Sequence, residues 1–141
     1  MEKNKTRYGE LIEKALEMRE KAYAPYSSFS VGAAVLMDDD RIYGGFNIEN
    51  ASFGATNCAE RTAIFNALTE GAKKIRALAV VGDLNDFTYP CGICRQVMVE
   101  FMDSPDMEVI IVKNKDSYRV HSIKEILPGA FTREDLEENN V

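Results

Sequence analysis

A chain of 141 residues has the length of one ordinary domain and can bury enough apolar surface to fold without a stabilising crosslink. Its 45% hydrophobic and 28% charged residues are typical of a soluble globular protein, and it contains no apolar run long enough to cross a bilayer. The net charge of −6 disfavours binding to the phosphate backbone of nucleic acids, so we expect neither a membrane protein nor a nucleic-acid-binding protein.

Apolar periodicity predicts alternating helices and strands along the chain. A helix is expected over residues 6–24, where apolar side chains recur at helical spacing until Pro25 ends the pattern. The remaining elements, in chain order, are predicted as strands over 30–37 and 41–47, a helix over 58–68, a strand over 77–81, a helix over 91–101, strands over 108–112 and 117–121, a helical turn over 123–127 and a polar helix over 132–138. This order favours an α/β fold with one mixed sheet flanked by helices, in a single domain over residues 1–141.

The sequence contains three cysteines and one histidine. Its first five residues carry mixed charge and lack the apolar core of a signal peptide, so a cytoplasmic location is expected. An odd number of cysteines in a reducing compartment argues against a disulfide framework. We therefore expect the thiols to be metal ligands, nucleophiles or buried apolar residues, and their spacing has to distinguish these roles.

Two short motifs place the cysteines at the starts of predicted helices. Cys58-Ala59-Glu60 begins one helix, and Pro90-Cys91-Gly92-Ile93-Cys94 begins another. Residues three apart share one face of a helix, so the two sulfurs of the second motif can converge on one metal ion. The first turn of a helix exposes unpaired N–H groups and the positive end of the helix dipole, which favour the thiolate that zinc binds. The spacing therefore predicts a zinc site assembled from two helix starts.

The number of available ligands favours a catalytic zinc over a structural one. Cys58, Cys91 and Cys94 supply three thiolates, and three protein ligands with a water in the fourth position is the catalytic arrangement. Zinc lowers the pKa of that water, and Glu60 is the carboxylate expected to carry protons. Three thiolates around a zinc dication leave one net negative charge, which Arg61 is expected to offset by a hydrogen bond to a ligand sulfur.

Three other interpretations of the cysteines remain open at this point. His121 would complete a closed shell of three cysteines and one histidine, which is the arrangement of a structural zinc. Cys91 and Cys94 alone would suit a redox centre at a helix start, although that leaves the Cys58-Ala59-Glu60 motif without a role. Free cysteines are also among the residues most often buried as ordinary apolar side chains.

Five motifs together resemble the small tetrameric cytidine deaminases, a group within the zinc-dependent nucleoside and nucleobase deaminases. In chain order they are Pro25-Tyr26-Ser27 with Phe29 and Val31-Gly32-Ala33, Asn47-Ile48-Glu49-Asn50-Ala51, Cys58-Ala59-Glu60-Arg61-Thr62-Ala63, Pro90-Cys91-Gly92 with Cys94-Arg95-Gln96, and Leu127-Pro128-Gly129-Ala130-Phe131. The resemblance implies a three-layer α/β/α sandwich with a mixed five-stranded sheet, and one zinc ion (Zn2+) per subunit. It also implies hydrolysis of cytidine and deoxycytidine to uridine and deoxyuridine with release of ammonia, in a homotetramer whose sites lie at subunit interfaces.

The same resemblance implies a role for each matching residue. The three cysteines would bind the zinc, and Glu60 would be the catalytic residue that moves protons. Among the implied substrate-binding residues, Phe29 would stack on the base, and Asn47 and Glu49 would contact ribose hydroxyls. The backbone of Ala59, together with that of Cys91, would read the base edge. Phe131 would reach into the site of a neighbouring subunit. Taken alone, Phe29 is typical of a core residue, and Asn47 and Glu49 are compatible with a plain exposed strand end.

Three positions depart from the family pattern. Phe53 stands where relatives often carry tyrosine, Tyr89 where a small residue is common, and Ile93 where alanine is usual. Because these residues change bulk and polarity next to the predicted site, they leave fine substrate preference open. The alternative functions are deamination of a modified cytosine nucleoside, such as a nucleoside antibiotic, and a noncatalytic zinc-stabilised oligomer that binds nucleosides.

Overall fold

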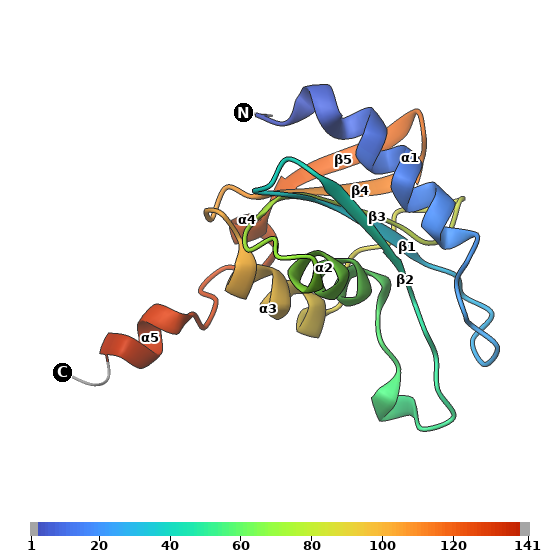
Figure 1. Cartoon of the computed structure of the whole chain (residues 1–141). Helices are drawn as coiled ribbons and strands as arrows, with labels where there is room; N and C mark the ends of the chain where they lie inside the picture. The colour runs from blue at the N-terminus through green and yellow to red at the C-terminus, as the bar shows by residue number, and fades with distance from the viewer. Residues whose placement is uncertain (1–2, 139–141) are drawn as a thin grey trace.

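Five strands form one mixed sheet in the computed structural model, which describes residues 3–138 (Figure 1). The strand order is β2-β1-β3-β4-β5, in which β3 and β4 are parallel and the other neighbouring pairs are antiparallel. The strands are β1 (Gly32–Met37), β2 (Ile42–Phe46), β3 (Ile75–Val81), β4 (Glu108–Asn114) and β5 (Ser117–Ser122). The helices are α1 (Tyr8–Arg19), α2 (Ala59–Thr69), α3 (Gly92–Phe101), α4 (Ile123–Ile126) and α5 (Arg133–Glu138), with the 3-10 turns η1 (Lys5–Arg7) and η2 (Phe53–Ala55).

Helices cover both faces of the sheet, so the protein has the expected three-layer α/β/α architecture (Figure 1). Helix α1 lies across one face, and α2 and α3 lie on the other. Alternation along β1 shows how the layers are filled: Ala34 and Leu36 pack in the cluster beneath α1, whereas Val35 and Met37 pack beneath α2 and α3. A strand buried on both faces has an almost continuous apolar sequence, which is why β1, β3 and β4 were recognisable as strands. No helix within residues 3–138 combines the length and apolar composition needed to cross a membrane.

The first helix is shorter than predicted. Helix α1 ends at Arg19 instead of residue 24, and the chain then turns so that Tyr23 forms a β-bridge with Ile48. The Tyr23 N–H donates to the Asn47 carbonyl at 3.0 Å, and the Tyr23 carbonyl accepts from the Glu49 N–H at 2.9 Å. This pairing satisfies the Tyr23 backbone outside a helix, and it overrides the helical periodicity of the sequence. The other predicted elements are present, with ends close to the predicted ones.

Gly45 of β2 lets α2 approach the sheet closely. A Cβ atom at this position would lie 2.3 Å from the backbone nitrogen of Ala63 and 2.8 Å from the carbonyl oxygen of Ala59. Both atoms belong to the backbone of α2, which cannot move aside as a flexible side chain can. Gly45 therefore sets the height of α2 over the sheet, and with it the position of Cys58 at the start of that helix.

We expect Gly45→Ala to destabilise the protein, because the added methyl group overlaps the α2 backbone. The free energy of unfolding, measured by chemical denaturation, should fall by about 1–3 kcal/mol, the usual range for overpacking a close contact. Gly9→Ala is the matched control, since nothing lies within 4 Å of a Cβ at this position in α1 and alanine favours a helix. Equal stability of the two variants would contradict the close packing.

Candidate metal centre and active site

Three cysteine sulfurs converge where α2 and α3 begin. Cys58 and Cys91 are the N-cap residues of the two helices, and Cys94 lies in the first turn of α3. The three sulfur atoms lie within 4.8 Å of one another, and those of Cys58 and Cys91 are 3.8 Å apart. Sulfurs bound to a tetrahedral zinc ion at about 2.3 Å would be roughly 3.8 Å apart, so the observed spacing fits zinc. The cysteines are thus positioned to bind the expected metal ion.

The Cys58 thiol is acidified by its neighbours. A hydrogen bond from the Cys94 thiol, with further help from Arg61, lowers the pKa of Cys58 to about 5. The same hydrogen bond, together with burial, raises the pKa of Cys94. In the metal-free protein the first thiolate therefore forms on Cys58, and zinc has to displace protons from the other thiols when it binds.

Arg61 places its guanidinium against the sulfur cluster. Its Nη2 donates to the Cys58 sulfur at 3.3 Å, which is the kind of contact expected from the sequence. Burial acts to lower the pKa of Arg61, but hydrogen bonds to Cys58 and Cys94 outweigh burial and raise that pKa. The Arg61 Nε is buried and has no hydrogen-bond partner within residues 3–138. Because an unpaired buried donor is unfavourable, the position of this cation indicates that attraction to the thiolates holds it there.

Glu60 is a buried carboxyl group in the first turn of α2, with only 4% of its surface exposed. Burial, with a smaller contribution from the negative charge of Cys58, raises the pKa of Glu60 to about 7, because desolvation disfavours the charged form. Glu60 lies two positions after the metal ligand Cys58, in the first turn of the helix that Cys58 caps. A carboxyl group with a pKa near neutrality can both accept and release a proton, as a general acid–base catalyst must.

Asn47 and Phe29 meet at the end of β2. The buried Asn47 side chain accepts a hydrogen bond from the Val31 N–H at 2.9 Å and donates one to the Phe29 carbonyl at 2.8 Å. These bonds use one acceptor position and one N–H of the amide, which leaves one of each for a ligand. The Phe29 side chain is 43% exposed, so its ring lies outside the core and is available for stacking.

Glu49 holds the loop that follows α1. Its carboxylate accepts hydrogen bonds from the backbone N–H groups of Tyr26 at 2.9 Å and Ser27 at 3.1 Å, and from the Ser27 hydroxyl. The bond from the Ser27 hydroxyl, followed by those from the backbone, lowers the pKa of Glu49, so the carboxylate is ionised near neutral pH. Sequence reasoning missed this loop-holding role, since Glu49 and the loop are far apart along the chain.

A cavity of about 370 Å³ lies beside Glu49. Its lining residues are Tyr26, Ser27, Glu49, Asn50, Phe53 and Thr56. Phe53 exposes 77% of its surface, and its ring centre lies 6.3 Å from that of Tyr26 in an edge-on arrangement. Tyr26 and Ser27 belong to the first motif of the family resemblance, but their place in a cavity wall was not predicted. Phe53 therefore departs from the family pattern at a position that shapes a cavity.

Ala59 and Phe131 occupy opposite environments. Ala59, the first residue of α2, exposes none of its surface. Phe131 is 56% exposed, and its carbonyl accepts a hydrogen bond from the Gln96 Nε2 at 2.8 Å. Phe131 is thus an exposed aromatic ring on an anchored backbone.

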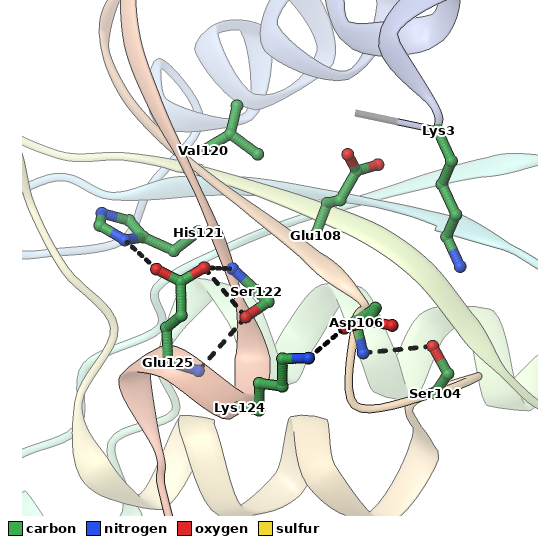
Figure 2. Close-up of a pocket in the computed structure, with 9 residues that line it drawn as sticks. All are labelled: Lys3, Ser104, Asp106, Glu108, Val120, His121, Ser122, Lys124 and Glu125. Atoms are coloured by element: carbon green, nitrogen blue, oxygen red, sulfur yellow. Dashed lines mark hydrogen bonds and ion pairs between the residues drawn. The ribbon is translucent and has the colours of Figure 1, made fainter. Parts of the chain in front are cut away.

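His121 lies apart from the sulfur cluster. Its Nε2 is 2.9 Å from the Tyr89 hydroxyl, and its Nδ1 is 3.8 Å from the Glu125 carboxylate. Figure 2 shows His121 and Glu125 in the wall of a second cavity, of about 550 Å³. The group of metal-binding side chains found within residues 3–138 consists of the three cysteines and excludes His121. The interpretation that His121 completes the ligand shell of a structural zinc is therefore wrong. The Tyr89 side chain is directed toward this histidine.

The three-layer fold and the three-sulfur centre define a zinc-binding protein of the α/β class, and its relatives identify the family. Residues 5–112 match the family described as the cytidine and deoxycytidylate deaminase zinc-binding region. A cytidine deaminase of Halalkalibacterium halodurans is 49% identical over 91% of this chain and 96% of its own length, and one of Sporosarcina psychrophila is 48% identical over 89% and 92%. The crystal structure of cytidine deaminase from Burkholderia pseudomallei is 49% identical, covers 86% of this chain and 97% of its own, and superimposes with a TM-score of 0.81. The chain belongs to the cytidine and deoxycytidylate deaminase family.

We expect Arg61→Leu to weaken zinc binding in mild acid. Protons compete with zinc for the sulfurs, so zinc is lost as the pH falls. Removing the guanidinium raises the pKa of Cys58 and should move the midpoint of zinc loss to higher pH by about one unit. A chromogenic chelator measures the released zinc. Arg76→Leu, which removes a surface partner of Asp40, is the control and should leave the midpoint of zinc loss at the wild-type pH. If both variants lost zinc at the same pH, the role of Arg61 would be contradicted.

Proposed function

We propose that this protein is a cytidine deaminase that hydrolyses cytidine and deoxycytidine to uridine and deoxyuridine with release of ammonia. The observation that carries the proposal is the buried Glu60 carboxyl group two positions after Cys58, one of three cysteines whose sulfurs lie within 4.8 Å of one another. The relatives from H. halodurans and S. psychrophila, which are named cytidine deaminases, support the same activity. An uncharged nucleoside also agrees with a chain of net charge −6.

In this proposal Cys58, Cys91 and Cys94 hold the zinc ion. When bound, zinc lowers the pKa of a water molecule and so supplies hydroxide near neutral pH. Glu60 accepts the proton of the attacking water, passes a proton to the ring nitrogen N3 of the base and then assists departure of the amino group as ammonia. Its burial keeps bulk water from competing for these protons.

Arg61 supports turnover by balancing charge. Three thiolates make a zinc centre net negative and a weaker Lewis acid than one with neutral ligands. The hydrogen bond from Arg61 to the Cys58 sulfur withdraws electron density from that ligand. We infer that Arg61 is needed for the rate of the reaction as well as for zinc retention.

Nucleoside binding is assigned to the end of β2 and the nearby loop. Phe29 would stack on the base, and the backbone at Ala59 and Cys91 would read the base edge. Asn47 and Glu49 would contact ribose hydroxyls, which act as both donors and acceptors of hydrogen bonds. The spare N–H and acceptor position of Asn47 and the ionised carboxylate of Glu49 supply suitable partners.

We further propose a cytoplasmic homotetramer in which Phe131 enters the site of a neighbouring subunit. The exposed ring of Phe131 on a backbone anchored by Gln96 supports this assembly. A noncatalytic oligomer would leave the buried Glu60 unexplained, because a structural zinc site needs no such carboxyl group beside it. A modified cytosine nucleoside is the second candidate substrate, because Phe53 gives the cavity beside Glu49 an apolar wall.

We expect Glu60→Gln to abolish release of ammonia from cytidine while zinc is retained. An amide cannot carry the proton, and loss of a general acid–base group usually lowers turnover by about 10²–10⁴-fold. Ultraviolet absorbance follows conversion of cytidine to uridine, and zinc content is measured on the same sample. Glu70→Gln, at the C-terminal end of the same helix, is the control. A Glu60→Gln protein with normal turnover would overturn the mechanism.

A mixing experiment tests whether Phe131 serves a neighbouring subunit. Phe131→Ala and Glu60→Gln should each be nearly inactive, because one lacks the shared ring and the other lacks the proton carrier. When both chains are refolded together in equal amounts, about a quarter of the sites in a symmetric assembly should combine an intact Glu60 with an intact neighbouring Phe131. Cytidine deamination should then return. If the co-refolded chains were no more active than the same chains refolded separately, a site shared between subunits would be contradicted.

A further inference from the structure

We propose that Arg95 is a positioning residue that couples the metal ligand Cys91 to the segment that carries Phe131. Arg95 lies in α3 one position after the ligand Cys94, and the reaction described above gives it no part. The kinetic consequence of this inference rests on the proposed function. The contacts that support it are a property of the fold and need no substrate.

The half-buried Arg95 side chain joins two carbonyl groups that are distant along the chain. Its Nε donates to the Pro90 carbonyl at 2.8 Å, and its Nη1 donates to the Ile126 carbonyl at 2.6 Å. Hydrogen bonds from a charged donor are stronger than those between neutral groups. A guanidinium also holds its donors in a rigid plane, so the two carbonyls are fixed relative to each other as well as to α3.

The bond to Pro90 fixes the turn that leads into the metal ligand. Pro90 is buried and precedes Cys91, the N-cap of α3, so its carbonyl lies outside the hydrogen-bond ladder of the helix. Arg95 supplies a partner for that carbonyl, and its own backbone N–H donates to the Cys91 carbonyl at 3.0 Å. One residue therefore holds both carbonyls that flank the start of α3, and movement of this turn would displace the Cys91 sulfur.

The bond to Ile126 fixes the place where residues 126–131, which we call the C-terminal segment, leave α4. Ile126 is the last residue of α4, where a helix leaves carbonyl groups without helical partners. Gln96, the next residue of α3, donates from Nε2 to the Phe131 carbonyl at 2.8 Å. Helix α3 thus anchors the C-terminal segment at both ends, and the exposed Phe131 ring projects from a backbone tied to the helix of the metal ligands.

The two anchors have separable effects. The Arg95 side chain bonds to both the metal-ligand turn and the start of the C-terminal segment, whereas the Gln96 side chain bonds to the end that carries Phe131. Loss of Arg95 should therefore disturb zinc binding and substrate binding together. Loss of Gln96 should disturb only the contribution of Phe131.

The test uses Arg95→Lys, because an ammonium group keeps the charge but cannot span both carbonyls in one plane. Zinc release to a chromogenic chelator should become about tenfold faster, and kcat/KM for cytidine should fall about as much, since partners of metal ligands typically contribute 10–100-fold to affinity or activity. Gln96→Ala should raise KM and leave zinc release at the wild-type rate. Arg133→Lys, at an exposed residue paired with Glu137, is the matched control and should change neither quantity.

A double-mutant cycle tests the coupling directly. The effects of Arg95→Lys and Phe131→Ala on kcat/KM should be less than additive, because the first substitution already misplaces the ring that the second removes. Wild-type zinc release in Arg95→Lys, or full additivity with Phe131→Ala, would overturn the proposal. Zinc release is measured without substrate and so tests the Arg95 proposal independently of the proposed function. A wild-type protein that did not deaminate cytidine would contradict the proposed function, but the zinc-release rates would still test the role of Arg95.

Folding of the variants is the remaining control. Should Arg95→Lys not fold, the same measurements are made on Arg95→Gln, whose amide can still donate to one of the two carbonyls. Failure of both variants to fold, beside a folded Arg133→Lys protein, would overturn a positioning role in favour of a purely structural one. Normal folding with faster zinc release supports the proposal.

Discussion

The starts of α2 and α3 meet on one face of the sheet, and the sulfur cluster of Cys58, Cys91 and Cys94 depends on the distance between them. Close packing of α2 on Gly45 brings Cys58 to this meeting point, while α3 brings Cys91 and Cys94. Neither helix carries the whole ligand set, so the sulfur cluster forms only when both helices are packed at the right height. The packing of β2 against α2 is therefore part of the metal centre, although Gly45 binds nothing itself.

Burial and hydrogen bonding divide the acidic groups of the site between two tasks. Hydrogen bonds from Cys94 and Arg61 lower the pKa of Cys58, whereas burial raises the pKa of Glu60, which lies two positions further along the chain. The Cys58 thiolate, which keeps its negative charge near neutral pH, is suited to bind a metal ion. The Glu60 carboxyl group, which gains and loses its proton near neutral pH, is suited to proton transfer. Arg61 stabilises the Cys58 thiolate directly through its hydrogen bond to the sulfur, whereas for Glu60 the effect of burial outweighs the effect of the Arg61 charge.

Local features of the sequence were predictable, and long-range contacts were not. The metal ligands were found because the spacing of Cys91 and Cys94 and the helix starts are local properties, and the α/β fold followed from apolar runs in β1, β3 and β4. The premature end of α1 was missed because it depends on pairing of Tyr23 with residues 47–49. The loop-holding bonds of Glu49 and the bridge made by Arg95 likewise join distant segments. The substrate-binding roles and the single domain over 1–141, whose ends lie outside the described residues, stay predictions.

Helix α3 lies in the connection between the parallel strands β3 and β4, and this has a consequence for the order of folding. Parallel neighbours cannot be joined by a tight hairpin and need a long crossover that returns the chain to the same end of the sheet. Cys91 is separated from Cys58 by 33 positions, and its helix is part of that crossover. Pairings with large sequence separation form slowly, because the entropy of loop closure is lost before contacts are gained. We therefore expect the complete set of three sulfur ligands to form late in folding, and to be able to hold zinc only after the crossover has closed.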